Sequence, residues 1–288
     1  MPRSQTWTVE ALRAAGDDEV VAAFAGHEVR EAALQAVLAS AQLSGSWAGP
    51  SGVVRVVLRD SGPAGREDAW TIRFAPGGVG LAERADPDVQ LRLPLLALVR
   101  LLTGQADGAL LHLAGELEVV GDEELVLALG ERLHPAGSTR PVIDPAALDP
   151  EAVAAAIDGV RTDHLASVMS GGFRPLVLEQ VFGRLPEFLI AEKAAGARVA
   201  ICFAIGGRHD GAVDRYVVRV TDGTCTVLAD APEGEDVDAT LVLDGHEFLR
   251  LVLGQLNPVR GVLSGQINVQ GHVMKALAFN SIMRIPGS

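Results

Sequence analysis

The sequence has very little cysteine: two residues, Cys202 and Cys225, in a chain of 288. Two cysteines cannot build a disulfide framework, and their spacing gives no Cys-x-x-Cys pair for a metal ion. Such sparse usage is typical of a reducing compartment, so we expect a cytoplasmic protein. The seven histidines include no pair four residues apart, the spacing that two metal ligands on one helix need. We therefore predict no metal site.

Long hydrophobic runs are also absent. The most apolar segment, residues 91–102, is interrupted by Arg92, Pro94 and Arg100, whereas a membrane-spanning helix needs about 20 apolar residues in succession. Residues 1–16 lack the apolar core of a secretory signal. We expect neither a membrane-spanning helix nor a secretory signal.

Basic residues are in the minority. The chain has 24 lysines and arginines against 37 aspartates and glutamates, which gives a net charge of −13. A protein this acidic is repelled by polyanions. We therefore expect no nucleic-acid partner and no strong docking on an anionic membrane.

What the sequence does contain is an internal repeat, in which residues 88–129 align without gaps on residues 238–279 at an offset of 150. The matched pairs include Asp88/Asp238, Leu91/Leu241, Leu93/Leu243, Arg100/Arg250, Gly104/Gly254, Gln105/Gln255, Gly115/Gly265, Val119/Val269, Gly121/Gly271 and Leu127/Leu277. Upstream, the offset slips to 146 and sets residues 69–74 beside residues 215–220. The chain is therefore interpreted as a tandem duplication of a domain-sized unit.

Proline content and length place the domain boundaries. Residues 134–150 contain four prolines, a composition typical of a linker. We predict a first domain over residues 1–134, a linker over 135–150 and a second domain over 151–288. Two similar domains can pack against each other with approximate two-fold symmetry inside one chain, as the two subunits of a homodimer do. We therefore expect an intramolecular pseudo-dimer. The chain itself should be a monomer or form a weak homodimer.

Each copy predicts the same order of elements, beginning with a helical region and two strands. These are residues 28–42, 53–59 and 69–74 in the first copy, and 173–189, 199–205 and 215–220 in the second. A short strand after a glycine turn follows, then a strand of period two, two helices, a further strand and a final helix. The final helix of the second copy has an apolar face formed by Met274, Leu277, Ala278, Ser281, Ile282 and Ile285. Each copy is therefore α+β.

Residue choice at the helix starts supports this order. Asp244 and Glu247 have the spacing of a capping box. Asn257-Pro258 and Asp107 are typical first residues of the next helix in each copy.

Three features together resemble the sterol carrier protein type 2 family. They are a glycine that ends a helix, a short helix after it, and the pattern small–Gly–x–Leu/Ile–x–Val–x–Gly before an amphipathic helix. The residues that carry the resemblance are Gly104, Gly115, Leu117, Val119, Gly121 and Asp122, and then Gly254, Asn257, Pro258, Ser264, Gly265, Ile267, Val269 and Gly271. The resemblance implies a five-stranded, mixed, mainly antiparallel sheet covered by helices in each repeat. It also implies an apolar tunnel that carries a fatty acid, sterol or other hydrophobic metabolite.

The resemblance further implies which residues line that tunnel. They are Leu98, Leu101, Leu102, Leu110, Leu125 and Leu129 in the first copy, and Phe248, Leu249, Val252, Leu263, Met274, Leu277 and Ile282 in the second. The same residues are equally typical of a closed hydrophobic core. Arg100 and Arg250 could anchor a ligand carboxylate at the tunnel mouth, or pair with a nearby acid.

No catalytic pattern accompanies these features. There is no dinucleotide fingerprint, P-loop or nucleophile elbow, so we predict no cofactor and no catalytic residue. His112 and His272 are the histidines best placed to face a pocket, and Cys202 is interpreted as a buried apolar residue. Two function classes stay open: a lipid-transport protein that binds an apolar molecule, and an enzyme that isomerises or cyclises a hydrophobic metabolite.

The two copies differ in their bulky residues. Six of the eight phenylalanines, and every methionine except the first residue, lie in the second copy. Phenylalanine and methionine line adaptable apolar sites. We therefore predict that the functional pocket lies in the second domain and that the first braces or covers it.

Overall fold

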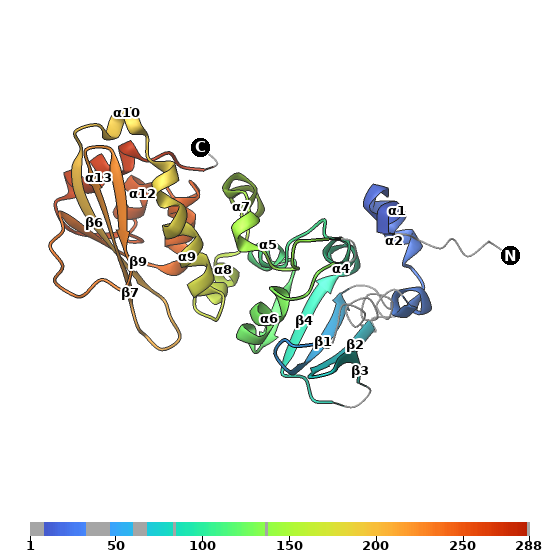
Figure 1. The fold of residues 1–288 in the computed structure, drawn as a ribbon. Helices are drawn as coiled ribbons and strands as arrows, with labels where there is room; N and C mark the ends of the chain where they lie inside the picture. The colour runs from blue at the N-terminus through green and yellow to red at the C-terminus, as the bar shows by residue number, and fades with distance from the viewer. Residues whose placement is uncertain (1–8, 33–46, 60–67, 83–84, 136–137, 287–288) are drawn as a thin grey trace. The chain divides into compact units, whose positions relative to one another are not determined.

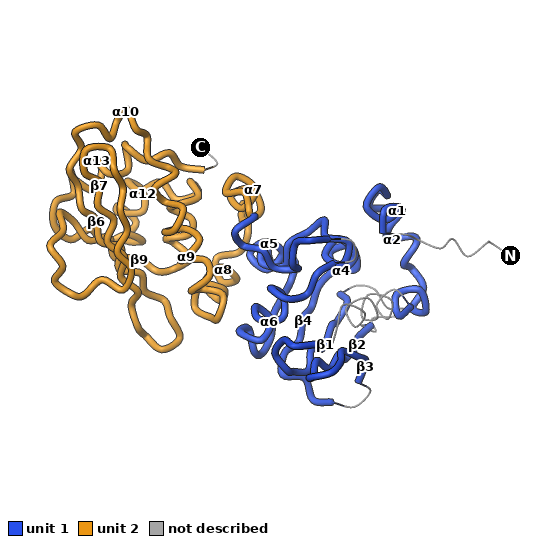
Figure 2. Tube along the Cα trace, viewed as in Figure 1, with its two compact units in different colours: residues 1–147 blue, residues 148–288 orange. Residues whose placement is uncertain are grey.

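The computed structural model describes residues 9–32, 47–59, 68–82, 85–135 and 138–286 (Figure 1). The chain divides into two compact units, residues 1–147 and 148–288 (Figure 2). Part of the first expected helical region, residues 33–42, lies outside the described residues. None of the helices in the described part of the chain has the length and apolar character needed to cross a bilayer.

The first unit contains one five-stranded sheet. Its strands are β1 (Gly52–Arg59), β2 (Asp68–Ala75), β3 (Gly78–Leu81), β4 (Val89–Pro94) and β5 (Glu118–Gly121). The spatial order is β3-β2-β1-β4-β5, in which β1 and β4 run parallel and every other neighbouring pair is antiparallel.

The second unit repeats this sheet. Its strands are β6 (Arg198–Gly206), β7 (Asp214–Thr221), β8 (Thr224–Leu228), β9 (Ala239–Asp244) and β10 (Asn268–Gly271). The order β10-β9-β6-β7-β8, with β6 and β9 parallel, is the first sheet read from its other edge. The predicted fold class, two tandem α+β repeats with mixed, mainly antiparallel five-stranded sheets, is confirmed.

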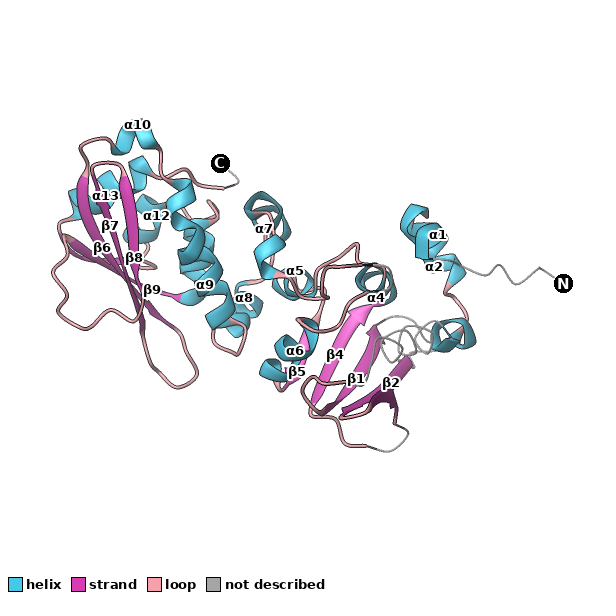
Figure 3. Cartoon of the chain, viewed as in Figure 1, coloured by secondary structure: helices cyan, strands magenta, loops and turns pink. Residues whose placement is uncertain are grey.

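The described residues of each unit also form helices (Figure 3). In the first unit they are α1 (Val9–Ala14), α2 (Asp17–Ala23), α4 (Leu95–Leu102), α5 (Gly108–Leu113) and α6 (Glu123–Gly130), with a 3-10 turn η2 at Pro145–Ala147. In the second they are α7 (Pro150–Ala156), α8 (Thr162–Val168), α9 (Arg174–Arg184), α10 (Ala191–Ala194), α11 (Gly245–Val252), α12 (Pro258–Leu263) and α13 (Val273–Ile282), with η3 at Leu185–Phe188. The short helices at the start of each unit were not predicted.

The backbone around Asp238 and Gly271 explains why these two residues match between the repeats. The Asp238 carboxylate accepts a hydrogen bond from the amide of Ala200, 2.8 Å away, and so joins the starts of the parallel strands β6 and β9. Gly271 has φ +91°, and a Cβ there would lie 2.7 Å from the carbonyl oxygen of Asp238. Asp88 and Gly121 repeat both arrangements in the first unit.

The predicted helix starts are confirmed. The amide of Asp244 donates to Glu247 Oε2 at 3.3 Å. The Oδ1 atom of Asn257 accepts from the third residue of α12 at 3.1 Å, and Asp107 accepts from two amides of α5. These bonds satisfy donors that have no partner inside the helix.

The expected linker, residues 135–150, contains a segment that packs on the first unit. The carbonyl of Val142 accepts from the amide of Gly108 at 2.8 Å, and the amide of Ile143 donates to the carbonyl of Gly130 at 3.0 Å. Ile143 is only 2% exposed and fills the space that a Cβ on either glycine would enter. The segment around Ile143 is therefore part of the first fold.

The predicted apolar face of α13 is correct for Ile282 and wrong for Met274 and Leu277. Its apolar face was expected at Met274, Leu277, Ala278, Ser281, Ile282 and Ile285, but the helix ends at Ile282 and its buried residues are Phe279 and Ile282. The chain leaves the helix at Met283, which forms a β-bridge with Leu189. Met274 and Leu277 are exposed. Both faces of α13 are apolar in sequence, and contact with the sheet selects the one that carries Phe279.

Aromatic rings fill the core of the second unit. The Phe203 ring, on β6, lies 5.6 Å from that of Phe248 on α11 and 6.1 Å from that of Phe279 on α13. The Phe182 ring of α9 lies 5.7 Å from Phe203 and 5.1 Å from Phe248. Helices α9, α11 and α13 therefore pack on the same face of this sheet.

The opposite face of the sheet carries Cys202. This residue is buried beside Val217 and Ala231, as the sequence predicted for a small apolar residue. Burial raises the pKa of the Cys202 thiol, which disfavours the nucleophilic thiolate.

Candidate functional site

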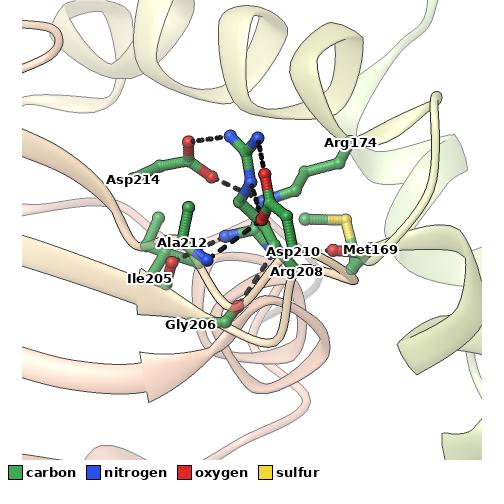
Figure 4. A network of polar contacts seen from close by, with 8 residues as sticks. All are labelled: Met169, Arg174, Ile205, Gly206, Arg208, Asp210, Ala212 and Asp214. Carbon is green, nitrogen blue, oxygen red and sulfur yellow. Dashed lines mark hydrogen bonds and ion pairs between the residues drawn. The ribbon is translucent and has the colours of Figure 1, made fainter.

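The most connected polar side chain of the second unit is Arg174, which is 2% exposed. Its Nε donates to Asp214 Oδ2 at 2.6 Å (Figure 4). Its terminal nitrogens donate to the carbonyls of Met169 at 2.6 Å, Ile205 at 2.7 Å and Gly206 at 2.9 Å. The guanidinium thus ties the end of α8 to the end of β6 and the start of β7.

The first unit builds the same centre around Arg30. This buried guanidinium donates to the carbonyls of Phe24 at 2.6 Å and Ala25 at 2.8 Å, and it forms an ion pair with Asp68. Burial disfavours the Asp68 carboxylate, but hydrogen bonds and charge from Arg30 and His27 outweigh it and lower the pKa of that carboxyl. The repeated pair fastens helices to the sheet, and sequence analysis missed it.

Around the second centre lies an outer ion pair (Figure 4). Arg208 donates to both carboxylate oxygens of Asp210, at 2.9 and 2.7 Å, and to Asp214 Oδ1 at 2.9 Å. The hydrogen bonds from Arg208, and then the amide of Ala212, lower the pKa of Asp210 to about 2. This network fixes the loop between β6 and β7.

The matched arginines Arg100 and Arg250 hold the first helices of their units. Arg100 donates to the carbonyl of Ala15 at 2.9 Å and to Asp17 Oδ1 at 2.8 Å. Arg250 donates to the carbonyl of Val160 at 2.6 Å. These contacts favour structural pairing over the alternative of a carboxylate anchor.

The matched glutamines act beside them. The Nε2 atom of Gln105 donates to the carbonyl of Arg13 at 3.0 Å, and that of Gln255 donates to the carbonyl of Ala154 at 2.8 Å. The Arg–Gln pair in the repeat therefore serves to attach the amino-terminal helices.

The two histidines singled out from the sequence have different surroundings. His112 is buried in α5, and its Nδ1 lies 2.9 Å from the carbonyl oxygen of Leu117. His272 is exposed at the start of α13. No described contact brings either to a reactive group.

Six of the eight large apolar side chains that are exposed in the described part of the second unit lie on two helices; the other two are Val213 and Leu228. Val259, Val262 and Leu263 lie on α12, and Val273, Met274 and Leu277 lie on α13. Leu263 is 83% exposed and Met274 is 75% exposed. At 3.6 residues per turn the three positions on each helix span an arc of about 100°, so they share one side of that helix. We call these six residues the α12/α13 apolar face.

The six equivalent positions of the first unit, all among the described residues, do not form such a face. Its equivalent positions, at the offset of 150, are Ala109, His112, Leu113, Glu123, Glu124 and Leu127. Leu113 is 6% exposed where Leu263 is open, and Glu124 stands where Met274 stands. The apolar face is therefore specific to the second unit, the one in which the sequence predicts the functional pocket.

The family model described as the SCP-2 sterol transfer family matches residues 32–133 and residues 191–284. The two matches fall on the two repeats. The chain belongs to the SCP-2 sterol transfer family. The resemblance noted in the sequence is thereby confirmed, and the duplication is a duplication of SCP-2 units.

One relative that is similar in sequence to this SCP-2 chain is a fatty acid-binding protein of Yarrowia lipolytica. It is 31% identical over 94 residues, which is 33% of the chain and 72% of the relative.

Solved structures give weaker likenesses. The apo sterol carrier protein 2 of Yarrowia lipolytica is 26% identical, with 43% of this chain and 91% of that one covered and a TM-score of 0.26. The inverting sec-alkylsulfatase Pisa1 of Pseudomonas sp. is 15% identical, with 49% of this chain covered and a TM-score of 0.34. The SCP-2 chain spans only 25% of the sulfatase. With scores this low, neither structure adds to the fold already described.

The predicted lining residues of the two SCP-2 units divide into three groups. Leu101, Leu125, Leu129, Phe248, Leu249 and Ile282 are buried; Leu98, Leu102, Leu110, Arg250 and Val252 are half-buried; Leu263, Met274 and Leu277 are exposed. Only the last group belongs to the α12/α13 apolar face. Sequence analysis missed Val259, Val262 and Val273, although their spacing on the two helices was a usable signal.

Proposed function

We propose that this protein binds an apolar lipid of the fatty-acid or sterol type, and that the lipid enters the second unit at the α12/α13 apolar face. The observation that carries the proposal is the exposure of six large apolar side chains there. Covering a leucine or methionine side chain stabilises by about 1.5–3 kcal/mol. An acyl chain or sterol can supply that cover, and apolar patches of this kind mark binding sites.

The core of the second unit suits such a ligand. Phe248 and Phe279 lie on the helices that flank α12 in sequence and are buried against the sheet. Rings offer apolar contact area without polar atoms that need partners. Membership of the SCP-2 family, and the fatty acid-binding name of the Yarrowia relative, support the ligand class.

The face also separates the roles of the two units. At the position of Met274 the first unit carries Glu124, and a carboxylate at an apolar entrance opposes lipid entry because its charge must be desolvated. We infer that the second unit receives the lipid. That the lipid then occupies a tunnel between sheet and helices stays a prediction.

Equilibrium binding of a fluorescent fatty acid, in buffer without vesicles, tests the proposal. The variants Met274→Glu and Leu263→Asp place a charge on the face at exposed positions, so the fold tolerates them. We expect each to weaken binding about tenfold or more. Leu228→Asp, at an exposed leucine on β8, is the matched control and should leave binding unchanged. Equal binding by all four proteins would reject the proposed site. Mass spectrometry of an organic extract identifies the lipid carried by the wild type.

A further inference from the structure

A serine and a histidine of the second unit lie in contact at its surface. Ser170 Oγ is 3.2 Å from His209 Nε2. Ser170 lies between α8 and α9, and His209 lies in the loop between β6 and β7. The fold thus brings together two residues that are 39 positions apart in the sequence. A serine hydroxyl within hydrogen-bond reach of an imidazole is the usual arrangement of an activated nucleophile and its base.

The segment that carries Ser170 is held by the Arg174 centre. The carbonyl of Met169, the preceding residue, accepts a hydrogen bond from Arg174 at 2.6 Å (Figure 4). The segment leads into α9, which begins at Arg174, and the peptide dipoles at a helix start favour negative charge. The backbone at Ser170 is therefore fixed, close to a helix start that suits the charge that develops on a carbonyl oxygen under attack.

The loop that carries His209 is fixed by an ion pair between its two neighbours. Arg208 donates to both carboxylate oxygens of Asp210, at 2.9 and 2.7 Å (Figure 4). The amide of Gly211 donates to the carbonyl of Arg208 at 3.1 Å and closes the turn. Catalytic side chains need support of this kind, because the reaction requires a geometry accurate to about 0.5 Å.

The pair is open to a substrate, since His209 is exposed and Ser170 is half-buried. The Ser170 hydroxyl also lies 2.8 Å from the carbonyl of Ser167, and its single proton goes either to that carbonyl or to a neutral imidazole. Within the described part of the chain, no hydrogen bond or ion pair joins a carboxylate to His209. A base without a carboxylate partner is less well oriented than the histidine of a catalytic triad, so the substrate needs a good leaving group.

We propose that Ser170 and His209 form a catalytic pair that hydrolyses activated acyl esters, an activity that goes beyond the proposed lipid binding. Ser170 Oγ forms a bond to the acyl carbon of an aryl ester or thioester, and the bond from that carbon to the leaving oxygen or sulfur breaks. The hydroxyl proton passes to His209 Nε2 and from there to the leaving group. Water then attacks the acyl carbon and gives a proton to His209, which returns it to Ser170 Oγ as the acid leaves.

The first unit has no hydroxyl at this position. Arg30 aligns with Arg174 at an offset of 144, and each donates to the carbonyl five residues before it. At the same offset Gly26 stands where Ser170 stands. The buried arginine centre therefore forms without a serine, and Ser170 is free to serve another role.

Reaction of the full-length protein with a fluorophosphonate tests the proposal, because this reagent modifies serines that a base activates. Mass spectrometry of the digested protein locates the modified residue. We expect the wild type to be modified at Ser170 and His209→Gln to react about a hundredfold more slowly. The wild-type rate should rise between about pH 5 and 8, as the imidazole loses its proton. The wild type should also release nitrophenol from p-nitrophenyl butyrate, and Ser170→Ala should not.

Two controls make the same chemical changes at exposed residues of the same unit. Ser167→Ala removes a neighbouring hydroxyl, and His272→Gln removes another imidazole. Both should react as the wild type does, with unchanged circular dichroism. A wild type that is not modified at Ser170 would overturn the proposal. Modification of His209→Gln at the wild-type rate would do the same, because the serine would then react without the histidine.

The fatty-acid assay keeps this activity distinct from the proposed function. Ser170→Ala should bind the fatty acid as the wild type does, and Leu263→Asp should hydrolyse the ester at the wild-type rate. If Leu263→Asp loses both activities, the reaction belongs to the α12/α13 apolar face and the catalytic pair is rejected. If the wild type binds the fatty acid but does not react with the fluorophosphonate, the pair is rejected and lipid binding stands.

Discussion

Arg174 Nε and Asp214 Oδ2 lie 2.6 Å apart at a point where a helix, a strand end and a loop meet. The same guanidinium also holds three backbone carbonyls, and a Cβ on Gly245 would lie 2.8 Å from its Nη1 atom. Arg30 and Asp68 repeat the pair in the first unit. The two units therefore use the same kind of buried pair at the same place in the fold.

The first prediction concerns the loss of one partner. Asp214→Ala leaves the buried Arg174 guanidinium without its carboxylate, and breaking a buried pair costs roughly 3–5 kcal/mol. We expect the free energy of unfolding of the second unit to fall by about 3 kcal/mol in urea titrations followed by circular dichroism. The loss is at the lower end of the range because Asp214 retains some exposure.

The matched control is Asp163→Ala. Asp163 pairs with Arg161 on the same unit, but both side chains are exposed, so its loss should leave the unfolding midpoint unchanged. If the two substitutions lowered the free energy of unfolding equally, the burial of Arg174 would not be the reason for the lost stability.

The second prediction is a dependence on pH in the first unit. The pKa of the Asp68 carboxyl is lowered: burial opposes the shift, and Arg30 and His27 cause it. A lowered pKa contributes stability that is present above the unfolded-state value, about 3.9, and is lost as pH falls through the folded-state value. Acid unfolding of the wild type should therefore steepen below about pH 4.

Asp68→Asn removes that titrating group. The variant should be less stable at neutral pH and should lose less of its stability as the solution is acidified. Parallel acid-unfolding curves for the two proteins would contradict the assignment of this pH dependence to Asp68.

Alternation and turn chemistry made the strands predictable. Residues 199–205 and 215–220 were expected as strands, and β6 and β7 extend each by only one residue at either end. Strand position follows from a local period of two and from the glycines that bound it. The offset of 150 between the copies then fixed the equivalence of the elements that follow.

The contacts of helices were harder to predict, because they depend on which of two apolar sides meets the sheet. In α13 the sequence allows Ile282 to share a face with Met274 and Leu277 or with Phe279, and periodicity alone does not decide. The Arg174 centre was missed for a related reason: Arg30 and Arg174 align at an offset of 144, whereas the upstream alignment used an offset of 146, which sets Arg30 beside Leu176. A two-residue shift hides a pair that has the same role in both units.

The third prediction separates backbone strain from steric contact. Gly271 and Gly234 both have positive φ, +91° and +86°, but a Cβ on Gly271 would lie 2.7 Å from the Asp238 carbonyl oxygen while one on Gly234 would meet nothing within 4 Å. Gly234→Ala should cost about 1–2 kcal/mol from conformation alone. Gly271→Ala should cost clearly more and should disturb the pairing of β10 with β9.

Urea titration measures both substitutions, and hydrogen exchange of the β9–β10 amides reports the local effect. If Gly234→Ala destabilised as much as Gly271→Ala, the close approach to Asp238 would not be the reason for glycine in the repeat.

The last prediction tests whether the segment around Ile143 belongs to the first unit. Ile143→Ala removes a buried side chain from between two glycines of α5 and α6, and such truncations cost about 2–5 kcal/mol. The surrounding helices have no side chain at Gly108 or Gly130 to fill the space, so we expect the upper half of that range. Limited proteolysis should then cleave near residue 143 at lower protease concentration, and the amide of Ile143 should lose its protection in hydrogen exchange. Val142→Ala, at the half-buried neighbour whose bond to Gly108 is made by the backbone, should change both readouts much less. A wild-type segment that is cleaved and exchanges as fast as an unstructured peptide would instead return residues 135–150 to the role of a free linker.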